Sequence, residues 1–442
     1  MNIGIFLKNN LKSIPPNIGV FINRIPYERR PGLGKVYRKR VKEIAEIDLL
    51  DKKEFVFKRI NIIVDYAYAN IKFYKDYYDK LGFHPNQLKS FEDLEKIPII
   101  NKSILNQYKL EDRSFPIKDR YVVNTGGTSG SPFGFYIQSD SMGHEWAHMH
   151  TIWKKLNYKP SDLKVVFGGR SDIKDLIEYD VVRNHFAIDI YADYDKVCNK
   201  LKKILKKHTI KYLHGYPSSI YDFAVYCENN NEEIVSLLKK TLKGTFLGSE
   251  YPHKHYRDKI ESVFGIKTIS WYGHTERAVL AYEKKCPFEY FPFLTYGFAE
   301  TIKNKNGENE LISTSYYNYA SPLIRYNTED LIEHPKFDKG LLESFQILNG
   351  RSGEFVTDFN GKKINLTALI FGRHHELFNF CKFIQVKQIT LGILEIYFVS
   401  NSIDEAEAAK LFDQSNLNFE ISFKKIAEPF RSLSGKISLL IK

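Results

Sequence analysis

The amino-acid sequence predicts an α/β protein with a large N-terminal domain of β-sheets packed with helices and a small C-terminal α+β domain. From about residue 120 onward, short β-rich runs alternate with segments of helical periodicity, which is typical of largely parallel sheets. The stretch 296–332 has instead the pattern of antiparallel strands, and 358–442 alternates strand and helix over the length of a small domain.

The N-terminal part of the chain is expected to be mainly helical. Residues 1 to about 50 read as irregular and short helical pieces, because several prolines interrupt them. Between Phe55 and Tyr78 apolar side chains recur at helical spacing. We therefore expect one amphipathic helix there, ended by Gly82.

Four segments in the middle of the chain alternate between strand and helix. Residues 164–167 are apolar and end at a glycine pair, and 211–214 are similar and end at one glycine. The segments 195–207 and 219–227 have helical spacing. This alternation predicts β-α-β units.

Two strands are expected at 298–302 and 310–314, because Asn306-Gly307 is a strong hairpin turn signal between them. A turn-rich stretch at 357–361 is suited to a hinge.

We therefore divide the chain into a domain of residues 1–357 and a domain of residues 358–442. The strands of the second domain would include 384–390 and 394–399.

Composition narrows the function classes. With 442 residues, 43% hydrophobic and 14% aromatic, the chain can form two or more compact domains. Its net charge of +12 makes nucleic acid a candidate partner. The lysines, however, are spread along helix-like stretches such as 200–207, and this pattern favours a solvated helix face. No aromatic-basic motif supports nucleic-acid binding.

The cysteines and the N-terminus predict a cytoplasmic protein. The four cysteines lie far apart in the sequence, which argues against a zinc site or a disulfide framework. The apolar run at 1–8 is too short for a secretory signal, and no segment is apolar enough for a transmembrane helix. Basic residues near the N-terminus leave peripheral contact with a membrane surface open.

The stretch 124–134 carries most information about function. Its eleven residues include four glycines together with hydroxyl and amide side chains, and a β-like run precedes it. Glycines let backbone N–H groups face a ligand, and hydroxyls add donors, a combination that suits phosphates. The stretch is not a Walker A motif, since no Gly-Lys-Ser/Thr follows. A Gly/Ser surface turn is the alternative.

Further motifs follow this loop in a fixed order, at 248–250, 271–276, 324–330, 350–351 and 431–436. The ordered set resembles the adenylate-forming superfamily of acyl-CoA synthetases, adenylation domains and luciferases. Within it, the chain looks most like the phenylacetate-CoA ligase and CapK-type branch, which the stretches 94–102 and 214–219 also fit. The resemblance covers roughly residues 55 to 442.

The resemblance implies a mobile phosphate loop and a role for the glycine-rich stretch. Hydroxyl and backbone donors there would hold the β- and γ-phosphates of ATP; they belong to Thr125, Gly126, Gly127, Thr128, Ser129 and Gly130. Many family members carry a lysine after the proline of this loop, where this chain has Phe133. The CapK branch also tends to lack that lysine, so its absence does not indicate inactivity.

The motif Tyr272-Gly273-His-Thr275-Glu276 is implied to bind ATP and metal. Glu276 would hold Mg²⁺, which prefers carboxylate oxygen. Thr275 could donate to the α-phosphate, and Tyr272 and Gly273 would border the adenine. The alternative is a β-turn with a surface glutamate.

The motif that ends at Asp330 is implied to bind the ribose, because a carboxylate can accept from both hydroxyls. The family usually has glycine before this aspartate, where this chain has Glu329, which puts the local loop geometry in doubt. Arg325 and Arg351 would contact ribose or phosphates. For Arg325 a structural salt bridge is the alternative.

Ser249 and Glu250 would lie at the adenine and substrate end of the pocket. Lys436, in Ser-Gly-Lys-Ile near the C-terminus, matches the adenylation lysine of the family, whose ammonium would bridge the acid carboxylate and the α-phosphate. An ordinary tail lysine is the alternative. His144 and His148 lack a third metal ligand nearby; in relatives the helix after the phosphate loop borders the acyl pocket.

These residues together predict an ATP- and Mg²⁺-dependent ligase that activates a small carboxylic acid as its acyl-adenylate. The small domain would swing between half-reactions, as the family implies. The acceptor would be an amine on a sugar or cell-envelope precursor, with the thiol of CoA second and AMP transfer to a cofactor hydroxyl third. A catalytically silent nucleotide-binding scaffold is the rival from another class.

Overall fold

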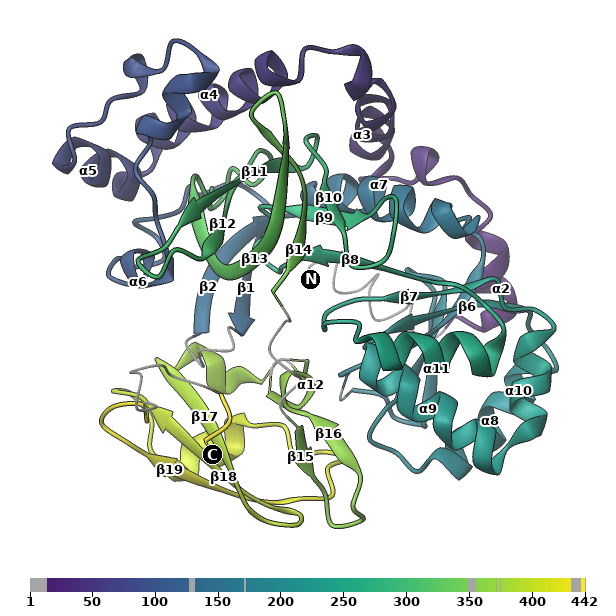
Figure 1. Cartoon of the computed structure of the whole chain (residues 1–442). Helices are drawn as coiled ribbons and strands as arrows, with labels where there is room; N and C mark the ends of the chain where they lie inside the picture. The colour runs from purple at the N-terminus through teal and green to yellow at the C-terminus, as the bar shows by residue number, and fades with distance from the viewer. Residues whose placement is uncertain are drawn as a thin grey trace.

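The computed structural model describes residues 14–126, 132–170, 172–348, 355–370, 372–373, 375–430 and 439–441. Within these ranges, strands form one twelve-stranded mixed sheet, a separate β1–β2 hairpin and two small sheets near the C-terminus. Helices flank the large sheet, and the C-terminal sheets lie below it in the view of Figure 1. The predicted α/β fold class is therefore confirmed.

The described helices are α2 (Pro16–Ile22), α3 (Gly34–Glu46), α4 (Lys52–Asn70), α5 (Lys72–Lys80), α6 (Lys102–Leu105), α7 (Ser141–Trp153), α8 (Tyr194–Leu205), α9 (Pro217–Asn230), α10 (Glu232–Lys239), α11 (Lys254–Phe264), α12 (Leu366–Ile370) and α13 (Glu405–Leu411). None of them, within the described ranges, is long and apolar enough to cross a membrane.

The strands before residue 300 begin with β1 (Arg120–Gly126), β2 (Pro132–Gln138), β3 (Leu163–Gly168), β4 (Ile177–Asp180), β5 (His185–Asp189), β6 (Ile210–Gly215), β7 (Gly244–Leu247), β8 (Thr268–Gly273), β9 (Leu280–Glu283), β10 (Tyr290–Pro292) and β11 (Gly297–Lys303). They continue with β12 (Asn309–Ser315), β13 (Tyr326–Asp338), β14 (Leu341–Ile347), β15 (Phe355–Thr357), β16 (Lys363–Asn365), β17 (Phe383–Thr390), β18 (Ile393–Val399) and β19 (Glu420–Lys425).

One half of the large sheet is parallel, as the alternating pattern predicts. Strands β5, β3, β6, β7 and β8 lie side by side in that order, and each neighbouring pair is parallel. Helices α8, α9, α10 and α11 gather beside this half (Figure 1). Side chains of α8, α9, α10 and α11 share one buried apolar cluster with β3, β5, β6 and β7. Burial of that apolar surface stabilises the layered arrangement.

The other half of the sheet is antiparallel and runs from β9 through β10, β14, β13 and β12 to β11. The predicted hairpin at 298–314 is present. Gly307 adopts φ +79° in its turn, a conformation that glycine tolerates without steric cost.

The single helix predicted over 55–78 is wrong, because the chain forms α4 and α5 with a break between them. Ile71 has extended backbone angles, φ −122° and ψ 116°. The side chain of Ile71 is buried. Two residues further on, the amide of Phe73 donates to the carbonyl of Asp112 at 2.8 Å. Tertiary contacts therefore override the helical spacing at this point.

The C-terminal segment has its own apolar core, which contains side chains of β17, β18, α13 and β19. Val356, on β15, packs into this same core. The division between residues 357 and 358 stays a prediction, and the contact of Val356 favours a boundary before Phe355.

Candidate nucleotide-binding site

Two of the predicted motifs meet at the end of strand β8. The hydroxyl of Tyr272 donates a hydrogen bond of 2.6 Å to Oδ2 of Asp330, which is 58 residues further along the chain. Tyr272 is buried, and burial together with the charge of Asp330 raises its pKa well above the usual value of 10. The phenol therefore remains a donor, and it orients a half-buried carboxylate.

Glu276 lies in the loop after β8 and is buried, with 5% of its surface exposed. Its Oε2 is 3.2 Å from Nδ1 of His274, and its Oε1 is 3.6 Å from Nζ of Lys102. The hydroxyl of Tyr326 also donates to Oε1, at 3.3 Å. Burial alone would raise the pKa of this carboxyl, but His274 and then Lys102 outweigh it and lower the pKa to about 2. Glu276 is therefore a buried charge that persists at neutral pH.

Lys102 reaches Glu276 because the segment before it is attached to strand β13. The amide of Ile100 donates to the carbonyl of Arg325 at 3.1 Å, and the amide of Asn327 donates to the carbonyl of Ile100 at 2.8 Å. Asn101 then caps helix α6 through the amide of Ile104. The stretch 94–102 fits the family pattern, but nothing in the sequence pairs Lys102 with Glu276, so no role for Lys102 was predicted.

Asp330 sits on a bulge of strand β13. The pairing of β12 with β13 jumps from Glu310 opposite Leu331 to Ile312 opposite Asn327, so the residues between Asn327 and Leu331 bulge out. The hydroxyl of Thr328 donates to a carbonyl of β12 at 2.8 Å and accepts from the amide of Asp330 at 3.2 Å. Bulges of this kind re-aim side chains beside functional sites.

Several non-glycine residues in or directly beside the predicted motifs adopt left-handed backbone angles. The φ angles are +68° for Ser249, +55° for Arg277, +47° for Arg325 and +62° for Glu329. Such conformations cost free energy and cluster at functional sites. Glu329 therefore adopts the left-handed conformation that glycine favours, at the position where the family usually has glycine. The loop thus forms with a glutamate in place of the glycine.

Sequence comparison places the chain beside two kinds of protein. It is 24% identical over 388 residues to Protein CapK of Staphylococcus aureus, an alignment that covers 84% of this chain and 80% of the relative. It is 23% identical over 338 residues to phenylacetate-coenzyme A ligase of Escherichia coli K12, covering 71% and 74%. The chain is therefore similar in sequence to CapK and to phenylacetate-coenzyme A ligase. No protein-family model matches it.

Solved structures share the fold over most of its length. A 2-hydroxyisobutyryl-CoA ligase in complex with 2-HIB-AMP and CoA superposes with a TM-score of 0.55 at 18% identity, covering 88% of this chain and 89% of that one. The same ligase in the postadenylation state gives a TM-score of 0.53 at 17% identity, with the same coverage. The predicted resemblance to CapK and to phenylacetate-CoA ligase is confirmed by the sequence relatives, and the solved structures confirm the fold.

Glu250 lies where β7 ends, beside the first turn of helix α9. Its Oε2 accepts from the amide of Ser218 at 3.2 Å, and its Oε1 is shielded from solvent with no hydrogen-bond partner in the described part of the chain. Burial raises the pKa of this carboxyl to about 7. Gly248, two residues earlier, admits no side chain, because a Cβ would come within 2.5 Å of the Trp271 ring.

Arg325 takes the structural alternative that the sequence left open. Its Nε donates to Glu300 at 2.7 Å, and another guanidinium nitrogen donates to the carbonyl of Ile97 at 2.8 Å. The guanidinium is buried and ties β13 to β11 and to the segment before α6. A contact between Arg325 and a nucleotide remains a prediction.

The remaining predicted residues are only partly described. Gly273 ends β8 and Thr275 lies in the loop after it, and both are exposed. Thr125 and Gly126 belong to β1 and pair with Phe133 and Pro132 of β2. Six predicted residues lie outside the described residues: Gly127, Thr128, Ser129, Gly130, Arg351 and Lys436.

Proposed function

We propose that this chain activates a carboxylic acid with ATP. The carboxylate oxygen would attack the α-phosphorus, the bond to the β-phosphate would break, and pyrophosphate would leave with an acyl-adenylate as the other product. Such a reaction needs a held triphosphate, compensation of charge on the α-phosphate and an oriented carboxylate. The observation that carries the proposal is the contact between two separate motifs: Tyr272 bonds to Asp330, and Glu276, from the motif of Tyr272, accepts from Tyr326 in the motif of Asp330.

Asp330 would accept hydrogen bonds from both ribose hydroxyls, because the bulge and the Tyr272 phenol fix its carboxylate. Tyr272 and Gly273 would border the adenine together with Ser249 and Glu250. Thr275, which is exposed, is free to donate to the α-phosphate. These roles follow the resemblance to the adenylate-forming superfamily.

Glu276 fits a Mg²⁺ ion that is shared with ATP. Mg²⁺ is usually held by one or two carboxylates together with substrate phosphates, so one persistent carboxylate is sufficient on the protein side. Within the described ranges no group of three metal-ligating side chains occurs, which leaves Glu276 as the protein donor of this proposal. The ion would neutralise phosphate charge. Lys102 and His274 hold the carboxylate in place beforehand.

The second step needs an acceptor for the acyl group, and two candidates are supported by different relatives. The resemblance to the CapK-type branch implies an amine of a sugar or cell-envelope polysaccharide precursor, and the chain is similar to CapK over 84% of its length. Similarity to phenylacetate-coenzyme A ligase favours the thiol of CoA. Either acyl transfer would take place in the cytoplasm, where ATP is present.

Helix α2, the first helix of the described part of the chain, supports a peripheral contact with a membrane surface. Ile18 and Phe21 on α2 expose 54% and 70% of their surface, and Ile25 follows with 49%. Exposed Arg24 lies among them. Apolar side chains with adjacent basic residues suit the interface of an anionic membrane. Co-sedimentation with anionic vesicles tests this contact.

Acid-dependent exchange of labelled pyrophosphate into ATP tests the proposed activation step. We expect exchange with at least one acid of a broad panel. Adding CoA or an amino sugar in turn then separates the acceptors, because only the true one yields a stable acyl product. Nucleotide binding without exchange for any acid would support the silent scaffold instead.

A further inference from the structure

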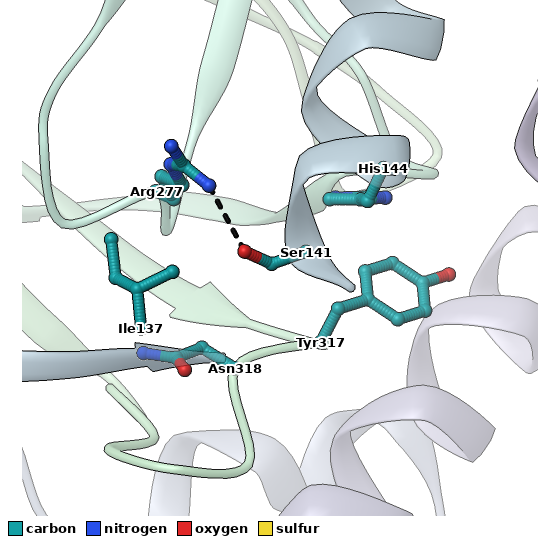
Figure 2. Close-up of a pocket in the computed structure, with 6 residues that line it drawn as sticks. All are labelled: Ile137, Ser141, His144, Arg277, Tyr317 and Asn318. Atoms are coloured by element: carbon teal, nitrogen blue, oxygen red, sulfur yellow. Dashed lines mark hydrogen bonds between the residues drawn. The ribbon is translucent and has the colours of Figure 1, made fainter. Parts of the chain in front are cut away.

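Arg277 directly follows Glu276 in the chain, and its side chain crosses to the start of helix α7. One terminal nitrogen of its guanidinium donates to the hydroxyl of Ser141, the first residue of α7, at 3.0 Å, and Figure 2 shows this bond beside a small cavity. The other terminal nitrogen donates to the sulfur of Met142 at 3.4 Å. Its Nε lies 3.9 Å from Oε2 of Glu145, one turn further along the helix. All three nitrogens therefore have partners on α7.

The backbone around Arg277 is fixed as well. Its φ of +55° is left-handed, a conformation that costs free energy in a residue with a side chain. Its amide donates to the carbonyl of His274 at 3.0 Å and so closes a turn around Glu276. The next residue, Ala278, is buried, and a Cβ at Gly297 would come within 2.0 Å of its carbonyl oxygen. The loop is therefore anchored at its exit, and a movement of Arg277 reaches Glu276 through one peptide bond.

Helix α7 is a firm support for this contact. It packs so closely on α3 that a Cβ at Gly143 would lie 3.0 Å from the carbonyl oxygen of Leu33. Further along α7, three large side chains belong to a buried apolar cluster: Met149, Ile152 and Trp153. Close-packed contacts of this kind leave a helix little freedom to shift.

The start of α7 is also attached to the β1–β2 hairpin, whose strands flank the glycine-rich stretch in the sequence. Only residues 139 and 140 separate β2 from α7. On the other strand, the hydroxyl of Tyr121 donates to the sulfur of Met142 at 3.8 Å, and the same sulfur accepts from Arg277. Arg277 thus links the loop of Glu276 to the hairpin that carries the predicted phosphate motif.

A direct contact with phosphate is the other use of an arginine at such a place. The guanidinium of Arg277 is already engaged, and Glu145, which also accepts from the hydroxyl of Tyr296, supplies the opposite charge. Engagement of all three nitrogens favours a link within the protein. Residues that orient a metal-binding side chain in this indirect way commonly change metal affinity or activity about 10- to 100-fold when they are replaced.

We propose that Arg277 is a positioning residue, which holds the loop of Glu276 against α7 so that this carboxylate meets the Mg²⁺ ion of Mg²⁺–ATP. The inference rests on the proposed function and adds the residue that sets its Mg²⁺ dependence. Arg277 would act through the backbone, without touching the nucleotide. Its loss should therefore weaken the binding of Mg²⁺ with ATP and spare AMP, which lacks the β- and γ-phosphates.

Arg277→Met removes the guanidinium and keeps an unbranched side chain. In acid-dependent pyrophosphate exchange, the Mg²⁺ concentration that gives half the maximal rate should rise about 10- to 100-fold. Thermal unfolding provides a readout without turnover. Mg²⁺ should raise the Tm of wild type with ATP above the value with ATP and EDTA, because a ligand that binds the folded state stabilises it. This Mg²⁺ increment should shrink in Arg277→Met, while the Tm shift caused by AMP persists.

Two further variants and a control sharpen the test. Arg277→Lys keeps the positive charge but not the fork of donors, so its Mg²⁺ dependence should fall between those of wild type and Arg277→Met. Glu145→Gln alters the partner of Arg277 rather than Arg277 itself, and should act in the same direction with a smaller effect. Arg183→Met, which removes a surface ion pair with Asp180, should leave the Mg²⁺ dependence unchanged.

Each outcome bears on a definite claim. An unchanged Mg²⁺ dependence in Arg277→Met would overturn the inference and leave the proposed function standing. Loss of the AMP shift together with the Mg²⁺ increment would reveal a general structural role and would overturn it too. If wild type exchanges with no acid, the proposed function fails, and the Mg²⁺ increment with ATP still decides the role of Arg277. A wild type without that increment would refute the inference. If Arg277→Met does not fold, Arg277→Lys and Glu145→Gln give the same measurements.

Discussion

Glu276 is the residue whose surroundings decide its chemistry most clearly. Its carboxylate is buried, and yet its charge is stabilised by His274 and Lys102, which come from its own loop and from a segment far earlier in the chain. Removing one member of a buried charge pair is costly because the other remains unpaired.

Glu276→Gln should therefore destabilise the protein at neutral pH. The pKa of Glu276 is lowered from 4.5 to about 2, so its stabilising contribution is present above pH 4.5 and is lost as pH falls toward 2. Urea unfolding should show a difference of about 3 kcal/mol between wild type and variant at pH 7 that shrinks with acidification. A constant difference, or one equal to that of the exposed control Glu428→Gln, would contradict this assignment.

Glu250 has the opposite pH dependence. Burial raises its pKa from 4.5 to about 7, so its protonated form is favoured in the folded protein. The associated stability is complete below pH 4.5 and is lost as pH rises through 7. Relative to Glu250→Gln, the wild type should lose up to about 3 kcal/mol between pH 4.5 and 8 in denaturant titrations. Parallel stability curves for the two proteins would refute the raised pKa.

At the scale of elements, the bulge of β13 aims Asp330 and holds Glu329 in a left-handed conformation with φ +62°. That conformation costs a side-chain-bearing residue about 1–2 kcal/mol, whereas glycine adopts it freely but loses about 0.5–1 kcal/mol in chain entropy. Strand β13 is therefore strained at Glu329, and the same bulge directs the side chain of Asp330.

Glu329→Gly should leave the protein equally stable or stabilise it by up to about 1 kcal/mol, because relief of strain outweighs the added chain entropy. Glu329→Val should destabilise it by roughly 1–2 kcal/mol, since a β-branched side chain tolerates this conformation poorly. Thermal unfolding of both variants checks the claim. A clear loss of stability for Glu329→Gly would show that the glutamate side chain contributes to the fold in another way.

At the scale of the whole molecule, the proposed function requires motifs from several elements to bind one nucleotide. A ligand at one hundred times its Kd stabilises the folded state by about 2.7 kcal/mol. AMP should therefore raise the Tm of the wild type, and Asp330→Ala should weaken this effect because the ribose hydroxyls lose a charged acceptor worth about 1.5–3 kcal/mol. An identical AMP-dependent shift in the variant would remove Asp330 from the site.

Lys436→Ala separates binding from chemistry. If this lysine bridges the acid carboxylate and the α-phosphate, its loss should abolish pyrophosphate exchange while the AMP-dependent Tm shift persists. Lys442→Ala, at the chain end, is the matched control. Wild-type exchange rates in Lys436→Ala would show that Lys436 is an ordinary tail lysine.

Local patterns predicted most of the elements. Strands β3 and β6, and helices α8 and α9, lie within a few residues of their expected positions. The prediction of one helix over 55–78 was wrong because helical spacing does not reveal tertiary contacts. The amide of Phe73 donates to the carbonyl of Asp112, and the chain is extended at Ile71. The parallel β5–β8 half was foreseen from alternation, whereas its joining to the antiparallel half through β8 and β9 was not.

The α/β class, the order of the motifs and the residue types that an ATP-dependent acid ligase would need can all be read from the order of amino acids. Only the tertiary structure decided which of those residues meet. It paired Tyr272 with Asp330, enclosed Glu276 with Lys102 and engaged Arg325 with Glu300. The physical reason is that hydrogen-bond partners and burial depend on distances between segments remote in sequence, which local spacing does not encode.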